Sequence, residues 1–184
     1  MNPAPGAARQ IYLIQPKFPI SYWGLEHFLP LTPYQAVFPP LGLLTLAALT
    51  PPDFAVSLCD ENIGESIDYQ TNAPIICITG YIIQIERVFE IAERFRALGK
   101  TVVIGGPLAN LLPDVCALYC DVLFEGEAEY TWARFLQDYL AGTVERRYQE
   151  PEKIHLPDSP PPTAGSAEGK LRPRHCAMHP RLSV

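Results

Sequence analysis

Residues 85–106 read IERVFEIAERFRALGKTVVIGG, an amphipathic helix pattern followed directly by an apolar strand pattern. Gly99 is placed to end the helix, and residues 101–106 predict a strand that is buried on both faces. A helix packed on a continuously apolar strand is typical of an α/β protein with a parallel sheet. The helical face is made by Ile85, Val88, Ile91, Ala92, Phe95 and Leu98.

The same alternation of strands and helices continues on both sides of this stretch. It predicts a doubly wound, mainly parallel five-stranded sheet of flavodoxin-like or Rossmann-like type, with right-handed crossovers. The other strands are expected at residues 11–15, 55–59, 75–79 and 122–125, and the other helices at residues 41–49, about 111–119 and 127–142.

One domain is expected, at residues 11–150, preceded by a flexible N-terminus at residues 1–10. Residues 151–184 are rich in Pro, Ser, Gly and Ala and have no apolar period. Such a segment cannot bury enough surface to offset its ordering entropy, so we interpret it as a linker and disordered tail.

Composition excludes several classes of protein. The net charge of −6 over 184 residues disfavours a nucleic-acid partner. The longest apolar stretch, residues 41–49, is too short to cross a bilayer, and the N-terminus does not resemble a signal peptide. Five cysteines without a disulfide framework suit a reducing compartment, so a cytoplasmic location is expected.

Open parallel sheets bind ligands beyond the carboxyl ends of their strands. The loops there follow Gln15, Thr79, Ile104 and Glu125, and glycines in them would let a ligand approach the backbone. These glycines are equally compatible with tight turns alone. The loops lack a dinucleotide fingerprint, a phosphate loop, the acids of a phospho-receiver and a G-x-S-x-G elbow.

The first of these loops, residues 16–40, is unusually long for a compact domain, and such loops usually bind ligands. Its aromatic side chains could cover a flat macrocycle, or they could pack on another domain or subunit. They are Phe18, Tyr22, Trp23, Phe28, Tyr34 and Phe38.

Five segments occur in a characteristic order: FPPLGLLTLAAL (38–49), DENI (60–63), TGYIIQIERVFEIAERFRALG (79–99), VVIGGPLANLLPD (102–114) and DVLFEGEAEYTWARFL (121–136). As an ordered set they resemble the N-terminal cobalamin-binding domain of B12-dependent radical SAM proteins. The resemblance covers about residues 11–162.

The resemblance implies that the nucleotide tail of cobalamin enters between the sheet and the helices, while the corrin lies across the strand ends. It implies no catalytic residue and no metal ligand in this chain. Glu127 and Glu129 are expected to cap the helix that follows them. The implied cofactor-binding residues are Gln15, Pro16, Thr79, Gly80, Tyr81, Gly105, Gly106, Pro107, Glu125 and Gly126.

The chain departs from the family in two motifs. The D-x-H-x-x-G motif of the cobalamin mutases is absent, and His27 is interpreted as an ordinary packing or surface residue. The C-x-x-x-C-x-x-C cluster motif is also absent, because Cys116 and Cys120 are followed by Leu123. We therefore expect no iron–sulfur cluster here, and S-adenosylmethionine only through a missing or separate barrel domain.

The tail brings His175, Cys176 and His179 close together in sequence. Three ligands in a segment without supporting structure make a poor metal site, so no metal is expected there.

The sequence thus predicts a cobalamin-binding module that lacks the catalytic half and catalyses nothing alone. A chain carrying the radical SAM barrel is a candidate partner. Two alternatives stay open: a cofactor-free interaction or remnant domain of the same fold, and a flavin- or nucleotide-binding flavodoxin-like protein. The main prediction requires an open crevice beside the glycines at the strand ends.

Overall fold

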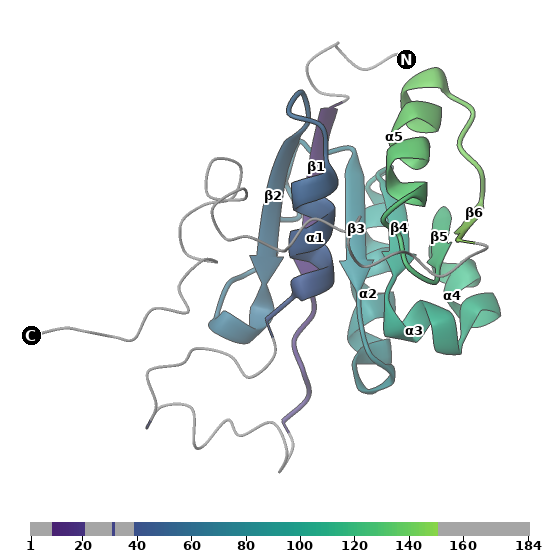
Figure 1. Ribbon diagram of the computed structural model, residues 1–184. Coiled ribbons are helices and arrows are strands. Elements are labelled where there is room, and N and C mark those ends of the chain that lie inside the picture. Colours follow the sequence, from purple (N-terminus) through teal and green to yellow (C-terminus); the bar gives the residue numbers. More distant parts are fainter. Residues whose placement is uncertain (1–8, 21–30, 32–38, 151–184) are drawn as a thin grey trace, which may run out of the picture.

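Six parallel strands form one sheet in the order β2-β1-β3-β4-β5-β6 (Figure 1). The order β2-β1-β3-β4-β5 confirms the doubly wound arrangement expected from the sequence. The strands are β1 (Gln10–Gln15), β2 (Ala55–Asp60), β3 (Ile75–Thr79), β4 (Thr101–Gly105), β5 (Val122–Glu125) and β6 (Arg147–Gln149).

The structure is a computed structural model, and it describes residues 9–20, 31 and 39–150. The expectations for residues 1–8, for the tail and its His175–Cys176–His179 group, and for His27 lie outside the described residues. Of the aromatic side chains in the first loop, only Phe18 is described.

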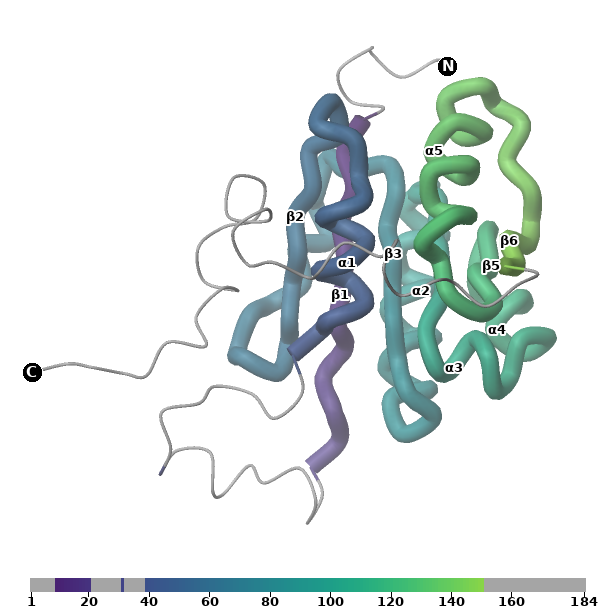
Figure 2. Tube along the Cα trace, in the orientation of Figure 1, coloured from purple at the N-terminus to yellow at the C-terminus, as the bar shows by residue number. Residues whose placement is uncertain are grey.

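Helices cover both faces of the sheet (Figure 2). On one face pack α1 (Leu41–Leu49) and α5 (Thr131–Ala141). On the other pack α2 (Ile85–Ala97), α3 (Pro107–Leu111) and α4 (Pro113–Tyr119). Two short 3-10 turns, η4 (Glu61–Ile63) and η5 (Ile82–Gln84), follow β2 and β3.

The inner strands β1, β3, β4 and β5 are buried because helices cover both faces of the sheet, which is why they read as nearly continuous apolar runs. In α2 the predicted face is buried at Val88, Ile91, Ala92 and Phe95. The single helix predicted at about residues 111–119 is instead two. Pro107 and Pro113 each occupy the first position of a helix, where proline is tolerated, and Leu112 separates the two.

The sheet has six strands and not the five predicted. The sixth is a three-residue edge strand whose one buried side chain is Tyr148. The Tyr148 ring stacks on Phe124, with ring centroids 5.2 Å apart, and its hydroxyl donates to Asp138 at 2.7 Å. One apolar residue between two polar ones leaves no strand pattern in the sequence, so tertiary packing produces this strand.

The crossover through α5 departs from the expected right-handed rule. Both α1 and α5 lie on the same face, but α1 leads toward the β2 edge and α5 leads toward the β6 edge. The crossovers through α1 and α2 are right-handed, so the β5–α5–β6 crossover has the opposite hand. The rule arises from strand twist, which is slight in a strand of three residues, so the packing of α5 decides the connection.

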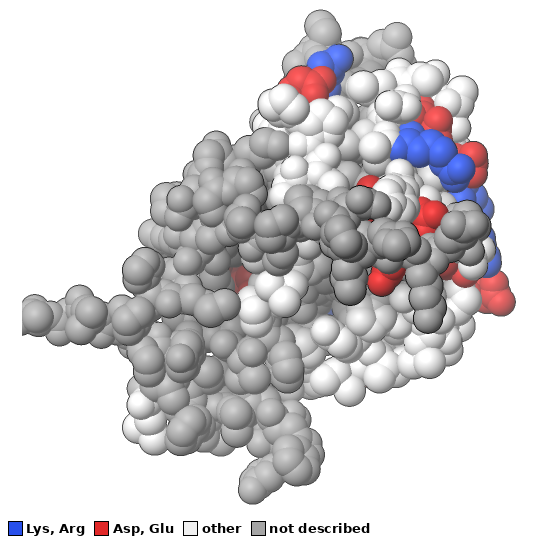
Figure 3. Space-filling model, viewed as in Figure 1, with Lys and Arg blue, Asp and Glu red and all other residues white. Residues whose placement is uncertain are grey.

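Charges of both signs alternate along the edge formed by α5 and β6 (Figure 3). Arg147, for example, pairs with Asp114 at 2.6 Å and with Glu125 at 3.3 Å. In the part of the chain that the structure describes, no helix combines the length and apolar character that crossing a bilayer requires.

Candidate functional site

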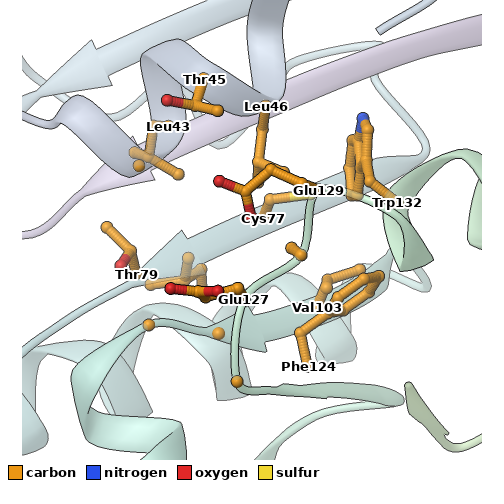
Figure 4. Close-up of a pocket in the computed structure, with 16 residues that line it drawn as sticks. Leu43, Thr45, Leu46, Cys77, Thr79, Val103, Phe124, Glu127, Glu129 and Trp132 are labelled. Atoms are coloured by element: carbon orange, nitrogen blue, oxygen red, sulfur yellow. The ribbon is translucent and has the colours of Figure 1, made fainter. Parts of the chain in front are cut away.

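A cavity of about 230 Å³ lies at the carboxyl edge of the sheet, between α1, α5 and the ends of β3, β4 and β5 (Figure 4). The strand ends form its floor, while α1 and the turn before α5 form its walls. This is the edge at which open α/β sheets bind ligands. The crevice that the sequence interpretation requires is therefore not filled by the side chains of the residues that the structure describes.

The inner end of the cavity is apolar. Trp132 lines this end. Its indole N–H donates to the Thr50 hydroxyl at 3.0 Å, so the ring offers the cavity an apolar surface. Burial raises the pKa of the Cys77 thiol, so that side chain remains neutral and behaves as an apolar group. The side chains at this end are Leu46, Cys77, Val103, Phe124 and Trp132.

Among the described residues, the polar side chains that line the cavity are the hydroxyls of Thr45 and Thr79 and the carboxylates of Glu127 and Glu129. Helix α5 begins only at Thr131, with no side-chain cap and no acid in its first turn. The expectation that Glu127 and Glu129 cap this helix is therefore wrong. Both lie in the preceding turn and line the cavity instead.

Four of the ten predicted cofactor-binding residues line this cavity: Thr79, Gly105, Gly106 and Gly126. The other six also occur at or just after the carboxyl ends of strands but do not line it. They are Gln15, Pro16, Gly80, Tyr81, Pro107 and Glu125.

The glycines at the strand ends are present for different reasons. A Cβ on Gly106 would collide with Thr79 Oγ1, and the positive φ of Gly106 (82°) also favours glycine, so the fold itself requires this residue. A Cβ on Gly105 would meet nothing nearer than Phe124 Cβ, at 3.4 Å. A Cβ on Gly126 would meet no atom within 4 Å. Packing inside the chain therefore demands glycine at position 106 but leaves space beside Gly105 and Gly126. The positive φ of Gly126 (82°) nevertheless favours glycine there, so only Gly105 is free of both constraints.

Gly80→Ala is expected to lower the free energy of unfolding by about 1–3 kcal/mol, the usual cost of overpacking a core. The reason is that a Cβ on Gly80 would lie 2.6 Å from Val88 Cγ2 in helix α2. Urea denaturation would measure the loss. The double variant Gly80→Ala/Val88→Ala removes the collision, so its loss should be smaller than the sum of the two single losses. A simple sum would contradict this account of Gly80.

A hydrogen-bond network holds the segment that leaves β1. The Pro16 carbonyl accepts from Gln84 Nε2 at 2.5 Å and from Asn62 Nδ2 at 3.1 Å. The ring of Phe18 lies 5.8 Å from that of Tyr81. Pro16 and Tyr81 thus help to position the start of the first loop at this edge of the sheet.

Exposed apolar side chains gather at the same edge as the cavity. They come from the start of α1, from η5 with the residue before it, and from the residue before α5. An apolar rim of this kind can lie against a flat ligand or another protein. The residues are Leu41, Tyr81, Ile82, Ile83 and Tyr130.

Sequence reasoning missed the cavity walls contributed by α1 and α5. Gly42 is the second residue of α1 and lines the cavity, and a Cβ there would meet no atom within 4 Å. Glycine is an unfavourable residue in a helix. A glycine inside this apolar helix pattern was therefore the one feature of the sequence that could have indicated that α1 lines a cavity. The apolar lining from Leu43, Leu46 and Trp132 had no signal of its own, because it reads as ordinary core.

The two cysteines of the incomplete cluster motif are packing residues, as predicted. Cys116 and Cys120 are buried on α4 and at its exit, and burial raises the pKa of each thiol to about 11. Among the described residues, no three His, Cys, Asp or Glu side chains converge in a way that could hold a metal ion.

Comparison with known proteins relates the chain to methyltransferases. It is 37% identical over 108 residues to bacteriochlorophyllide d C-8(2)-methyltransferase of Chlorobaculum tepidum, a match to 59% of this chain and 24% of that protein. It is 32% identical over 152 residues to an uncharacterised methyltransferase of Synechocystis sp., covering 82% of this chain and 28% of that protein. It is also 32% identical to hopanoid C-2 methylase of Rhodopseudomonas palustris, covering 65% and 23% respectively.

The chain spans about a quarter of the length of these curated relatives. No family model matches it. Among solved structures it is similar to the N-terminal domain of a hypothetical protein of Thermotoga maritima, with 19% identity and a TM-score of 0.40, covering 47% of this chain and 74% of that one. A likeness at this level carries no argument about the site.

Proposed function

We propose that this chain binds cobalamin and is the cofactor-binding part of a methyltransferase of the radical SAM type. The observation that carries the proposal is the open cavity beside Gly105 and Gly126 at the carboxyl edge of the sheet. Neither a collision nor a positive φ requires glycine at position 105, so room for a ligand is the reason we propose for Gly105. The φ of Gly126 (82°) favours glycine by itself, so Gly126 adds open space but no separate argument.

The cavity is large enough to hold one bicyclic base but too small to hold a whole cobalamin. An apolar cavity of about 150 Å³ holds benzene, and pockets for drug-sized ligands span roughly 300–1,000 Å³. A volume of about 230 Å³ lies between these limits. It suits the dimethylbenzimidazole at the end of the cobalamin tail, while the corrin would lie outside on the apolar rim around Leu41, Tyr81 and Tyr130.

The residues that would hold the tail are Thr79, Gly105 and Gly126 on the floor side and Gly42 and Trp132 on the walls. Bound cobalamin would supply a cobalt-carried methyl group, which is chemistry the cofactor brings and the protein positions. The apolar inner end would exclude water from the base.

The names of the relatives support methyl transfer as the shared chemistry. The named targets, a bacteriochlorophyllide and a hopanoid, are chemically unlike, yet this chain is similar to a part of each protein. A segment common to enzymes with such different targets is better suited to handling a shared methyl carrier than to recognising a target. The partner would then be a catalytic part that carries the radical SAM chemistry, in the same protein or in another chain.

An absorbance experiment tests the proposal. The purified chain is mixed with hydroxocobalamin, passed through a desalting column and scanned in the visible range. We expect corrin absorption to elute with the protein at up to one equivalent. A colourless protein would favour a cofactor-free interaction domain, and retention of flavin in a parallel run would favour a flavodoxin-like role. Both outcomes would contradict cobalamin binding.

A further inference from the structure

We infer that the side chains of Asn62 and Glu61 form a latch on the main chain of residues 16–18, and that this latch opens locally while the sheet stays folded. In its closed state the latch holds Phe18 beside Tyr81 at the carboxyl edge of the sheet. Asn62 is thus a positioning residue for this edge. Only the coupling of the latch to a ligand rests on the proposed function.

Asn62 contacts the main chain that leaves β1 with both ends of its amide group. Its Oδ1 accepts from the backbone N–H of Phe18 at 2.9 Å, and its Nδ2 donates to the Pro16 carbonyl at 3.1 Å. The same Nδ2 donates to Asp60 Oδ1 at 2.8 Å. Because Asp60 is buried at the end of β2, it fixes the orientation of the amide relative to the sheet.

Glu61 contacts the residue between these two. Its Oε2 accepts from the backbone N–H of Lys17 at 3.0 Å. Arg87 on α2 holds the same carboxylate through two hydrogen bonds, from Nε to Oε2 at 3.0 Å and from Nη2 to Oε1 at 2.6 Å. Each of residues 16–18 therefore has a backbone polar group that is bound by a side chain from the η4 turn.

Hydrogen bonds, more than packing, hold the segment in this position. A hollow of about 420 Å³ is lined by residues 17–20 on one side and by Glu61 and the η5–α2 junction on the other. Lys17, Pro19 and Ile20 are exposed. Opening would therefore expose little additional apolar surface, and segments of this kind open with a free energy far below that of global unfolding.

The closed latch affects ligand binding through Phe18. The Phe18 ring lies 5.8 Å from the ring of Tyr81, which belongs to the apolar rim on which the corrin would lie. A ligand on this rim would meet the paired rings only when the latch is closed. It would therefore shift the population toward the closed state, to the extent that it binds that state more tightly.

Trypsin cleavage of the full chain at the Lys17–Phe18 bond tests the latch. Lys17 is the only lysine or arginine between Arg9 and Arg87, so this product reports opening of this segment. The digest is followed by mass spectrometry at several low urea concentrations. We expect a rate that is nearly independent of urea, because local opening exposes little surface. Cleavage at Lys100–Thr101, at the start of β4, should be slower and should rise steeply with urea.

Three variants test the role of Asn62, with circular dichroism to verify folding. Asn62→Ala removes the bonds to Pro16 and Phe18 and should raise the cleavage rate at Lys17 at least about fivefold. Asn62→Asp keeps an acceptor but loses the donor to Pro16, and should raise the rate by a similar factor. Asn72→Ala makes the same truncation at an exposed position before β3 and should leave the rate unchanged. If Asn62→Ala fails to fold, the urea dependence of the parent decides.

A ligand arm tests the coupling. Hydroxocobalamin, at a free concentration about ten times its dissociation constant, should slow cleavage at Lys17 in the parent at least about fivefold. If the parent binds hydroxocobalamin without this protection, the coupling is overturned while the latch stands. If the parent binds no cobalamin, the proposed function and the coupling fail together.

Two results would overturn the latch itself, and neither depends on a ligand. One is a cleavage rate at Lys17–Phe18 that rises with urea as steeply as the rate at Lys100–Thr101, since the segment would then open only with the whole domain. The other is a rate that folded Asn62→Ala leaves unchanged.

Discussion

Gly105→Val is expected to abolish the retention of cobalamin while the chain still folds. Position 105 is the last residue of β4, where a β-branched side chain is favourable. A Cβ there would make only an ordinary contact with Phe124. The two methyl groups of valine would take volume from a cavity of about 230 Å³, in which the base must fit closely. The measurement is corrin absorption after desalting, with circular dichroism to verify folding.

Two controls distinguish blocked space from general damage to the sheet. Gly105→Ala adds one methyl group and should reduce retention less than Gly105→Val does. Ala55→Val adds two methyl groups at an exposed position on the edge strand β2, away from the cavity, and should leave retention unchanged. If folded Gly105→Val retains as much cobalamin as the parent, the base does not lie beside Gly105.

The fold could be predicted where local pattern and tertiary packing agree. The bounds expected for α1, β3 and β5 match the structure, because each is an apolar run bounded by proline, glycine or polar residues. Strand β6 could not be predicted, since only Tyr148 in it is apolar and its partners Phe124 and Asp138 are distant in sequence. The hand of the α5 crossover likewise depends on which face of the sheet its apolar stripe covers.

The candidate site was predictable in location but not in composition. The carboxyl ends of parallel strands share an edge, so Thr79, Gly105 and Gly126 could be expected near one another. What each glycine does could not be read from the sequence. Gly80 is kept by the closeness of Val88 on α2, and Gly105 has free space beside it, yet both simply follow an apolar run. That difference arises from helices on opposite faces of the sheet.

The opposite walls of the cavity come from α1 and α5, which are separated by most of the chain. Sequence pattern describes each helix as core-facing, and that is correct for both. It does not describe the gap that remains between two helices on one face. The capping role expected for Glu127 and Glu129 failed for a related reason: the α5 helix begins later than its apolar period suggested, so the acids belong to a turn.

Trp132→Ala is expected to lower the free energy of unfolding by about 3–5 kcal/mol, the largest stability effect of the changes considered. Trp132 is almost fully buried and packs on Phe124 and Phe135, with ring centroids 5.8 Å and 5.4 Å away. Its indole N–H donates to Thr50, which joins α5 to the end of α1. Truncation would leave a cavity and break the contact that holds the two walls together. Urea denaturation followed by circular dichroism would measure the loss.

The controls for Trp132→Ala separate ring packing from the hydrogen bond. Trp132→Phe keeps an aromatic ring but has no donor for Thr50, so its loss should be about 1–2 kcal/mol, that of one hydrogen bond and some packing. Leu140→Ala truncates an exposed residue of the same helix and should change stability by no more than about 0.5 kcal/mol. If Trp132→Ala lowered the free energy of unfolding as little as Leu140→Ala, the positions of α1 and α5 would not depend on Trp132. The cavity would in that case depend on the sheet alone.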